Sequence, residues 1–456
     1  GTRYARLNMP RRFAVAAPVV ALPVLLVGAC ESLDATEDYR KAGELVESRT
    51  GDPAPPWPEG ADPTALWDGA SPLSADVAVR VALAANPGLL AQAQSIGAAR
   101  ADVAQAGLLP NPVLGVTLGF PGGGEESITS VSVSLVQQLA ALWTRGDRIA
   151  AAEGDLDAQI LTLSDAALEL ATRVRLAHAR AHGAERLTDL TREHWELLDR
   201  LIGVAQQRID AGEGTRLDLT RVMLAQRSLE ADQRAAELEL ITARHELLAL
   251  LGRADAPADF PLAADDGPRA PLPDERGAMD LAAAQRLDVA ITDARRRAAL
   301  AELSRARGER IPEIEAGVEY TSDDERRQEF GPTVGVEIPI FDTGDAAVAK
   351  AAANARTADF AARAARQHAF AEARGALVRA VAADELAAFT REQVLSLSGE
   401  SLELARSAVA AGQADTTVLL EAQREEIQTR LGLARAELRS AEARITLARA
   451  VGGRLG

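Results

Sequence analysis

The chain has 456 residues, of which 47% are hydrophobic and only 3% aromatic, and its formal charge at pH 7 is −17. This acidic balance argues against nucleic acid as a partner, because phosphate binding needs a basic surface. The low aromatic content and the many alanines favour closely packed helices over a bulky globular core. With a single cysteine, the chain can form no intramolecular disulfide.

The first residues are typical of an exported protein. Arg11-Arg12 precedes an apolar run that ends in small residues at Ala29, as in a signal peptide that comprises residues 1–29. Residues 1–8 are interpreted as translated sequence upstream of a true start at Met9.

Cys30 follows Val-Gly-Ala, a string that resembles the lipobox of bacterial lipoproteins, in which the cysteine is acylated and becomes the mature N-terminus. The resemblance implies the outer membrane, because Glu31 stands where Asp commonly causes retention at the inner membrane. The alternative is an ordinary signal peptide followed by a coincidental cysteine. Residues 30–74 contain six prolines and no sustained hydrophobic period, which predicts an extended, lipidated N-terminal tether.

Helical and strand periods then alternate within residues 75–253. The predicted elements in chain order are a helix interrupted at Asn86-Pro87 (75–109), a β-hairpin (113–136), a long helix (about 145–210), a turn (211–215) and a second helix (about 216–251). Asn86 is placed to cap the helix that Pro87 opens. The long helix would extend about 100 Å, so it must pack along other helices, as a coiled coil or a helical barrel.

A proline-rich linker (254–274) leads to residues 275–456, which repeat the order of the first unit: helix, β-hairpin (313–341), long helix, turn (411–415) and helix. Landmarks of the two units recur at an offset of 200 residues: Asn86-Pro87 and Arg286-Leu287, Pro112 and Pro312, Ala211-Gly212 and Ala411-Gly412. Three landmarks in the same order at one spacing indicate an internal duplication.

The strands of both hairpins alternate between apolar residues and small or polar residues. The apolar sets are Leu114, Val116, Leu118 and Phe120; Val131, Val133 and Leu135; Ile314, Ala316, Val318 and Tyr320; and Val334, Val336, Ile338 and Ile340. Such strands suit a barrel with lipid outside and water inside. Four strands cannot close a barrel, and an open edge in lipid leaves backbone groups unpaired, so three protomers with twelve strands are predicted. The alternative is a soluble β-sandwich attached to a coiled coil.

At this point the sequence resembles the TolC-like outer-membrane efflux factors, over nearly the whole mature chain. The first unit carries Ala85-Asn86-Pro87 and the run from Ala106 to Pro112, and the second carries Arg286-Leu287-Asp288-Val289 and the run Ile338-Pro339-Ile340-Phe341-Asp342-Thr343-Gly344. The family usually has Pro where Leu287 stands. Within the family, the sequence is most similar to the subunits of heavy-metal and drug resistance pumps.

The resemblance implies a mainly α fold with a membrane β-barrel. Long antiparallel helices would form a periplasmic α-barrel, and four transmembrane strands per protomer would contribute to a 12-stranded barrel in a homotrimer. Such a channel passively conducts substrates expelled by an inner-membrane pump, of the RND type, through a periplasmic adaptor. The implied location is the outer membrane, in contact with its lipid. The only attached group expected is the lipid on Cys30; no catalysis, cofactor or metal is expected.

By the same resemblance, the two turns form the periplasmic end, where an adaptor docks and the aperture closes. The docking candidates are Ala211, Gly212, Gly214, Ala411, Gly412 and Ala414. Among acidic residues near these turns, Glu421 and Asp415 are hypothesised to line a cation-favouring constriction, and Asp218 is a further candidate. The alternatives are simple turns and solvated surface carboxylates.

Other interpretations remain open at this point. The channel could instead serve type I protein secretion, and a periplasmic adaptor lipoprotein would also contain a coiled coil, although with one helical hairpin and larger β-domains. An enzyme is not supported by any catalytic grouping. His178 and His182 are spaced to share a metal on a helix, but incidental surface placement is the favoured interpretation.

Overall fold

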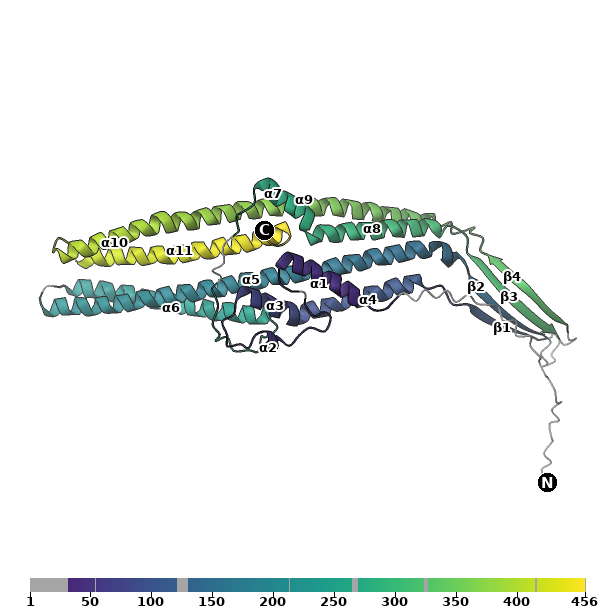
Figure 1. The fold of residues 1–456 in the computed structure, drawn as a ribbon, viewed down its shortest axis with the longest axis horizontal. Coiled ribbons are helices and arrows are strands. Elements are labelled where there is room, and N and C mark those ends of the chain that lie inside the picture. Colours follow the sequence, from purple (N-terminus) through teal and green to yellow (C-terminus); the bar gives the residue numbers. More distant parts are fainter. Residues whose placement is uncertain are drawn as a thin grey trace, which may run out of the picture.

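The computed structural model describes residues 32–53, 55–120, 130–212, 214–264, 270–323, 327–414 and 416–455. The protein is elongated, with a four-stranded sheet at one end, two long helical hairpins at the other and shorter helices around the middle (Figure 1). Within the described ranges, no helix combines the length and the apolar character needed to cross a membrane.

Both halves of the chain follow the same order of elements. The first half contains α3 (Ala75–Ala85), α4 (Pro87–Gly107), β1 (Val113–Gly119), β2 (Ser130–Gln138), α5 (Ala140–Asp210) and α6 (Arg216–Leu250). The second contains α7 (Glu275–Gln285), α8 (Leu287–Gly308), β3 (Ile314–Asp323), β4 (Gln328–Val336), α9 (Asp345–Phe389), the π-helical segment η1 (Thr390–Val394), α10 (Leu395–Ala410) and α11 (Thr416–Val451). At 71 residues, α5 extends about 105 Å.

The 200-residue offset persists in the contacts between elements. Asn86 caps α4 as its sequence context predicts, accepting hydrogen bonds at Oδ1 from two amides of the first turn at 3.0 and 3.2 Å. Its Nδ2 donates to the carbonyl of Leu250 at 3.0 Å, which ties the α3–α4 junction to the end of α6. In the second half, Arg286 Nη1 donates to the carbonyl of Ala450 at 3.3 Å. The same junction is therefore fastened to the same helix end in both halves.

Two glycines at these junctions show why the contact is so close. Gly252 and Gly452 both have positive φ, 72° and 97°. A Cβ on Gly252 would lie 2.9 Å from the carbonyl oxygen of Ala85, and one on Gly452 would lie 2.7 Å from the carbonyl carbon of Gln285. Only glycine meets both demands, the left-handed backbone and the absent side chain.

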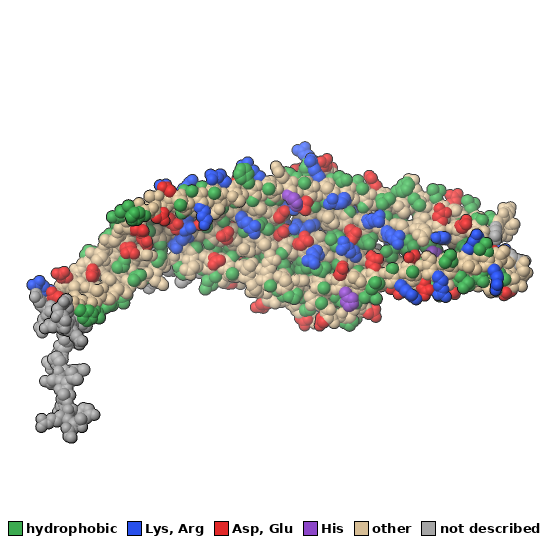
Figure 2. Space-filling model, turned by 180° about the vertical axis from the view of Figure 1, so that it is seen from behind, with side chains coloured by type: hydrophobic (Ala, Val, Ile, Leu, Met, Phe, Trp, Pro, Cys, Tyr) green, Lys and Arg blue, Asp and Glu red, His purple; other side chains and the backbone are tan. Residues whose placement is uncertain are grey.

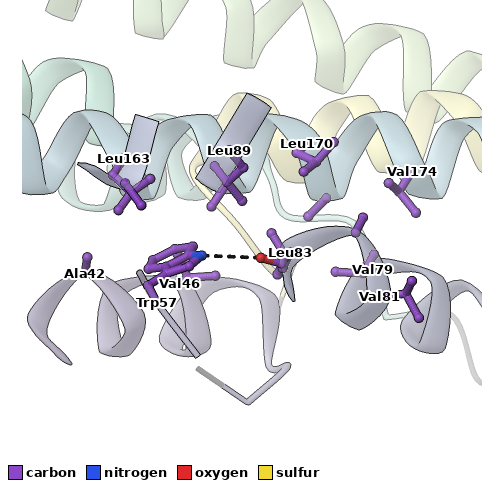
Figure 3. Close-up of a cluster of buried hydrophobic side chains, with 14 of the residues drawn as sticks. Ala42, Val46, Trp57, Val79, Val81, Leu83, Leu89, Leu163, Leu170 and Val174 are labelled. Carbon is purple, nitrogen blue, oxygen red and sulfur yellow. Dashed lines mark hydrogen bonds between the residues drawn. The ribbon is translucent and has the colours of Figure 1, made fainter. Parts of the chain in front are cut away.

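The expected extended tether over residues 30–74 is wrong for its described part. Residues 36–50 form α1 (Thr36–Thr50), and a short helical turn, α2 (Pro63–Leu66), follows. Three aliphatic residues of α1, Ala42, Leu45 and Val46, pack against the core, and the prolines that follow obscured their helical period. Ala42 and Val46 are buried, and so is Trp57 (Figure 3). We call residues 32–73 the N-terminal strap. Cys30 lies outside the described residues.

The strap completes the main hydrophobic core, where α3, α4 and α5 meet the end of α6. Trp57 Nε1 donates to the carbonyl of Leu83 at 3.3 Å (Figure 3). On α1, the fully buried carboxylate of Asp38 accepts two hydrogen bonds from the guanidinium of Arg100, at 2.8 and 2.7 Å. The strap is thus held by both apolar burial and a two-point ion pair.

The strap also contacts the second half of the chain. Arg49 Nε donates to the carbonyl of Gln285 at 3.1 Å, and the amide of Arg454 donates to the carbonyl of Arg49 at 3.1 Å. The end of α1 therefore joins the first half to the α7–α8 junction and to the last residues of the chain.

The second hairpin is shorter than the predicted 313–341. Strand β4 ends at Val336, whose partner Ile314 is the first residue of β3. One more hydrogen bond follows, from the amide of Glu337 to the carbonyl of Glu313, and then no partner strand remains. Pro339 has no backbone N–H and cannot donate a hydrogen bond to a neighbouring strand. The apolar alternation from Ile338 onward therefore continues without strand pairing.

Replacing Asp38 by Asn is expected to destabilise the protein by about 3–5 kcal/mol, because Arg100 would lose the charge of its buried partner. Denaturant unfolding followed by circular dichroism measures the loss. Glu37→Gln is the matched control, since the ion pair of Glu37 with Arg40 is exposed and its loss should leave stability unchanged. Equal stability of Asp38→Asn and wild type would contradict a structural role for the strap.

Candidate functional site

The strand register gathers the apolar residues of all four strands on one face of the sheet. The sheet is antiparallel with the order β1-β2-β3-β4. One cross-strand row runs through Val116, Val133, Tyr320 and Phe330, and the next through Leu114, Leu135, Val318 and Pro332. A slip of one residue at any pairing would break both rows, because successive side chains point to opposite faces.

This apolar face is exposed in the single chain. Leu114 is 65% exposed, Val116 61% and Val334 71%. An apolar surface of this extent requires a cover, and no element of the described chain provides one. The predicted division into an apolar and a polar face is confirmed for the residues that lie in the strands, whereas Phe120, Ile338 and Ile340 of the predicted apolar sets lie beyond β1 and β4.

The opposite face is lined by small and polar residues. Ser130 stands opposite Gly119, and a Cβ on this glycine would lie only 2.2 Å from Ser130 Oγ. Ser132 and Thr321 share a hydrogen bond of 2.9 Å across the β2–β3 pair. None of the four strands contains Lys or Arg, whereas Glu315, Glu319 and Glu329 all lie on this face. Figure 2 shows acidic side chains against a largely uncharged surface over the strands.

Both outer strands present an unpaired edge. Strands β1 and β4 each pair on one side only, so one row of backbone amides and carbonyls per strand has no partner in the described chain. Unpaired edges are a template for adding another strand. The sheet is therefore open at both edges, and each edge is able to pair with a further strand.

At the other end of the molecule, the two predicted turns join α5 to α6 and α10 to α11. Gly212 and Gly412 take positive φ, 77° and 69°, next to Ala211 and Ala411. In the first turn the amide of Gly214 donates to the carbonyl of Arg208 at 3.0 Å. In the second turn the amide of Gln413 donates to the carbonyl of Ala408 at 2.8 Å. Ala414 follows in the second turn. These bonds close the last turn of each helix.

The three acidic candidates near the turns have different surroundings. The Asp218 carboxylate accepts hydrogen bonds from the hydroxyl and amide of Thr215, at 2.6 and 3.3 Å, and so completes a capping box at the start of α6. Glu421 is exposed on α11 and forms no ion pair within the described part of the chain. Asp415 lies outside the described residues.

Of the two histidines His178 and His182, the first has a structural role. His178 is not a surface residue as expected: it is 2% exposed, and its Nε2 lies 2.8 Å from the carbonyl oxygen of Leu73 in the strap. No group of three metal-ligating side chains occurs among the described residues.

Ion pairs join the two halves along α5 and α11, which sequence patterns did not predict. Glu437 on α11 accepts hydrogen bonds from Arg186 on α5 at 2.6 Å and from Arg391 on η1 at 2.7 Å. Arg180 contacts Glu442 at 2.6 Å. The helices come closest at Gly183, where a Cβ would lie 2.9 Å from a methyl carbon of Leu438. Because the partners of these ion pairs lie so far apart in the sequence, no local sequence pattern predicts that they meet.

His194 lies nearer the turns, on the face of α5 toward the second hairpin. The residue is 6% exposed, and its Nδ1 has no hydrogen-bond partner among the described residues. Burial lowers the pKa of His194 below its ordinary value, and Arg424 on α11 lowers it further, whereas Asp232 on α6 acts in the opposite direction. Protonation of this buried imidazole is therefore unfavourable in the folded protein.

Acidification is expected to destabilise the folded protein through His194. Because the pKa of His194 is depressed in the folded state, the stability gained by keeping it neutral is complete above about pH 6.5 and is lost as the pH falls through the lower, folded-state value. The free energy of unfolding, measured against pH, should lose this component in His194→Gln and keep it in the control His182→Gln. An identical pH profile for His194→Gln and wild type would contradict the assignment.

The sequence, together with this geometry, defines the class of protein. The sequence profile of the outer membrane efflux protein family matches residues 78–253 and 278–453, two segments that again differ by 200 residues. The chain belongs to the outer membrane efflux protein family. The recognition of the family from the duplicated motifs is thereby confirmed.

Individual relatives are more distant. The chain is 28% identical over 287 residues to the nickel-cobalt-cadmium resistance protein NccC of Alcaligenes xylosoxydans xylosoxydans, covering 61% of this chain and 64% of that protein. It is 25% identical over 297 residues to the cobalt-zinc-cadmium resistance protein CzcC of Cupriavidus metallidurans, covering 60% and 65%. The aligned part is thus slightly less than two thirds of each relative's length.

The fold has counterparts among solved structures. CusC, whose crystal structures are described in terms of folding and transmembrane channel formation, superposes with a TM-score of 0.70 at 19% sequence identity. The superposition covers 88% of this chain and 98% of CusC. At this identity, the likeness concerns the fold.

Proposed function

We propose that the protein is one subunit of a trimeric outer-membrane channel that passively conducts substrates in a tripartite efflux system. The observation that carries this proposal is the sheet, which combines an exposed apolar face, a polar acidic face and two unpaired edges. Membership of the outer membrane efflux protein family supports it.

The trimer follows from the need to pair both sheet edges. In lipid, unpaired backbone groups cost several kcal/mol each, so the strands must form a closed barrel. If β4 of one copy pairs with β1 of the next, every interface is the same and a ring closes. Three copies of this four-stranded sheet supply twelve strands, an even number within the range of bacterial barrels.

The opposite end of the molecule is proposed as the periplasmic aperture. The turns at Gly212 and Gly412 lie at the far end from the sheet, where an adaptor and an inner-membrane pump would approach (Figure 1). A Cβ on either glycine would meet nothing within 4 Å, so both turns are open to a partner. Ala211, Gly214, Ala411 and Ala414 complete the proposed docking turns.

A lipid anchor on Cys30 is compatible with the direction of the strap. Asp38, near the start of α1, is bound to Arg100 in the half of α4 that leads to the sheet. Cys30 precedes Thr36, the first residue of α1, by six positions, which span at most about 20 Å. The anchor would therefore lie on the side of the molecule toward the proposed membrane segment.

The cargo proposed first is divalent metal cations. Two relatives are named for resistance to nickel, cobalt, zinc and cadmium. The polar face of the sheet carries carboxylates and no basic residue, which suits the passage of cations. A duct for protein secretion is the second candidate, since the fold alone does not distinguish these cargoes.

Native mass spectrometry of the Cys30→Ser protein extracted from membranes tests the assembly. A trimer obtained only with detergent is expected, because the apolar faces of three sheets would form a belt around the barrel. A monomer that is soluble without detergent would overturn the channel and favour a periplasmic adaptor instead.

The two faces of β1 should respond oppositely to charge. Val116→Arg places a cation on the proposed lipid face and is expected to cost about 2–4 kcal/mol near the middle of the membrane, whereas Thr117→Arg, on the polar face, should be tolerated. The amount of trimer in outer membranes measures the difference. Equal amounts for the two variants would argue against the lipid assignment.

Glu421→Gln is expected to reduce the preference of the open channel for cations over anions, because one carboxylate per subunit is removed near the aperture. Planar-bilayer recordings of reversal potential under a salt gradient measure it. Asp218→Asn serves as the comparison, since its carboxylate is engaged in the capping box. An unchanged reversal potential in Glu421→Gln would remove Glu421 from the aperture.

A further inference from the structure

The outer face of α6 has no partner within the described part of the chain. Leu217, Leu224 and Leu238 are spaced by multiples of seven and are 59%, 70% and 66% exposed. Arg221 lies on the same face between the first two leucines, and it is also exposed. We call Leu217, Arg221 and Leu224 the α6 stripe. A heptad spacing of apolar residues is typical of a helix that packs along another helix.

The second hairpin carries a groove between α10 and α11. Its apolar lining includes Leu397, Leu404, Ala408 and Val418, and its rim carries three carboxylates, those of Glu400, Glu421 and Glu425. None of the three carboxylates forms an ion pair within the described ranges, and neither does Arg221. We call this surface the acidic groove.

The charges of the two hairpin ends are complementary. Residues 199–227 of the first hairpin contain five arginines and four acidic residues, whereas residues 399–427 of the second contain two arginines and six acidic residues. Figure 2 shows basic side chains along the lower hairpin near its end. Contact between unlike hairpins is therefore favoured over contact between like ones.

Within one chain, the stripe and the groove cannot meet. Helix α6 packs on α5, α5 on α11, and α11 on α10, so that α6 and α10 are the outer helices of the pair of hairpins (Figure 1). In a closed ring of copies, the outer helix of one protomer faces the opposite outer helix of the next.

The duplication places the two surfaces at the same height. Both hairpins turn at equivalent glycines, Gly212 and Gly412, so Arg221 and Glu421 are each nine residues from the turn. On the antiparallel helix α10, Leu404 is eight residues from it. Copies related by an axis along the helices lie at equal height, which brings Arg221 opposite Leu404 and Glu421.

We propose that the acidic groove on α10–α11 binds the α6 stripe of the neighbouring copy, with its leucines in the groove and Arg221 between the carboxylates of Glu421 and Glu425. The occupant is a second copy of this chain, and the inference rests on the proposed ring. In this contact the carboxylate of Glu421 would be paired with Arg221 of the neighbouring copy.

Cysteine crosslinking tests the contact. Cys30→Ser removes the only native cysteine. Leu217→Cys and Ala408→Cys, introduced together, then place one thiol on each hairpin at about the same distance from its turn. A short bismaleimide is expected to link most chains of the trimer to one another. Leu238→Cys with Ala408→Cys is the matched control, because Leu238 is 21 residues farther along the same face, about 30 Å away.

A charge exchange tests the pairing. Arg221→Glu is expected to lower the temperature at which the trimer dissociates, and adding Glu421→Arg should recover most of that loss. Native mass spectrometry on the same samples separates two failures. A trimer whose Leu217→Cys and Ala408→Cys chains stay unlinked, or whose Ala408→Cys reacts freely with maleimide, overturns the groove contact alone. Absence of a trimer overturns the proposed channel itself.

Discussion

Backbone hydrogen bonding at the edges of a four-stranded sheet constrains the rest of this molecule. Strands β1 and β4 leave one row of amides and carbonyls each without partners, on a sheet with an exposed apolar face. The apolar face is unfavourable in water, and the unpaired edges are unfavourable in lipid. In the proposed ring, lipid covers the face and equivalent sheets pair the edges. The long helices continue from the strands, so the proposed closure would also set their spacing around the axis of the ring. Under that proposal, the exposed leucines on α6 and α10 would lie between subunits.

The internal duplication explains why the two halves of the chain have similar structures. The positions at which the halves depart from each other show how they differ. The Asn86 and Arg286 junctions are fastened to equivalent carbonyls, yet Arg286 also binds Asp288 at 2.7 Å, an interaction that Asn86 has no charge to make. The strap packs mainly on the first half, where the larger core lies, while the core of the second half is built mostly of alanine. Helix α5 is continuous, whereas η1 interrupts the corresponding helix of the second half.

The sequence predicted those features that depend on local pattern. Two-residue alternation located β1, β2 and β3 and the two faces of the sheet, but it placed the fourth strand at Val334 to Ile340, whereas β4 spans Gln328–Val336. Proline-free helical periods located α5 and α6 to within about five residues. The strap was missed because its helix carries few aliphatic residues and its burial depends on partners far along the chain, such as Arg100 for Asp38. The Arg186–Glu437 contact and the acidic groove also depend on tertiary packing. Local periodicity does not determine which charged residues meet across helices.

The contact between Arg49 and Arg454 has a consequence for the order of events during folding. The carbonyl of Arg49 receives its hydrogen bond from a residue 405 positions later, beyond α11. This last contact of the strap can therefore form only after nearly the whole chain has been synthesised. The apolar contacts of the strap and the Asp38–Arg100 ion pair involve the first half and can form earlier. A chain that lacks its last residues would therefore keep the packed strap but lose the hydrogen bond that joins it to the C-terminal end.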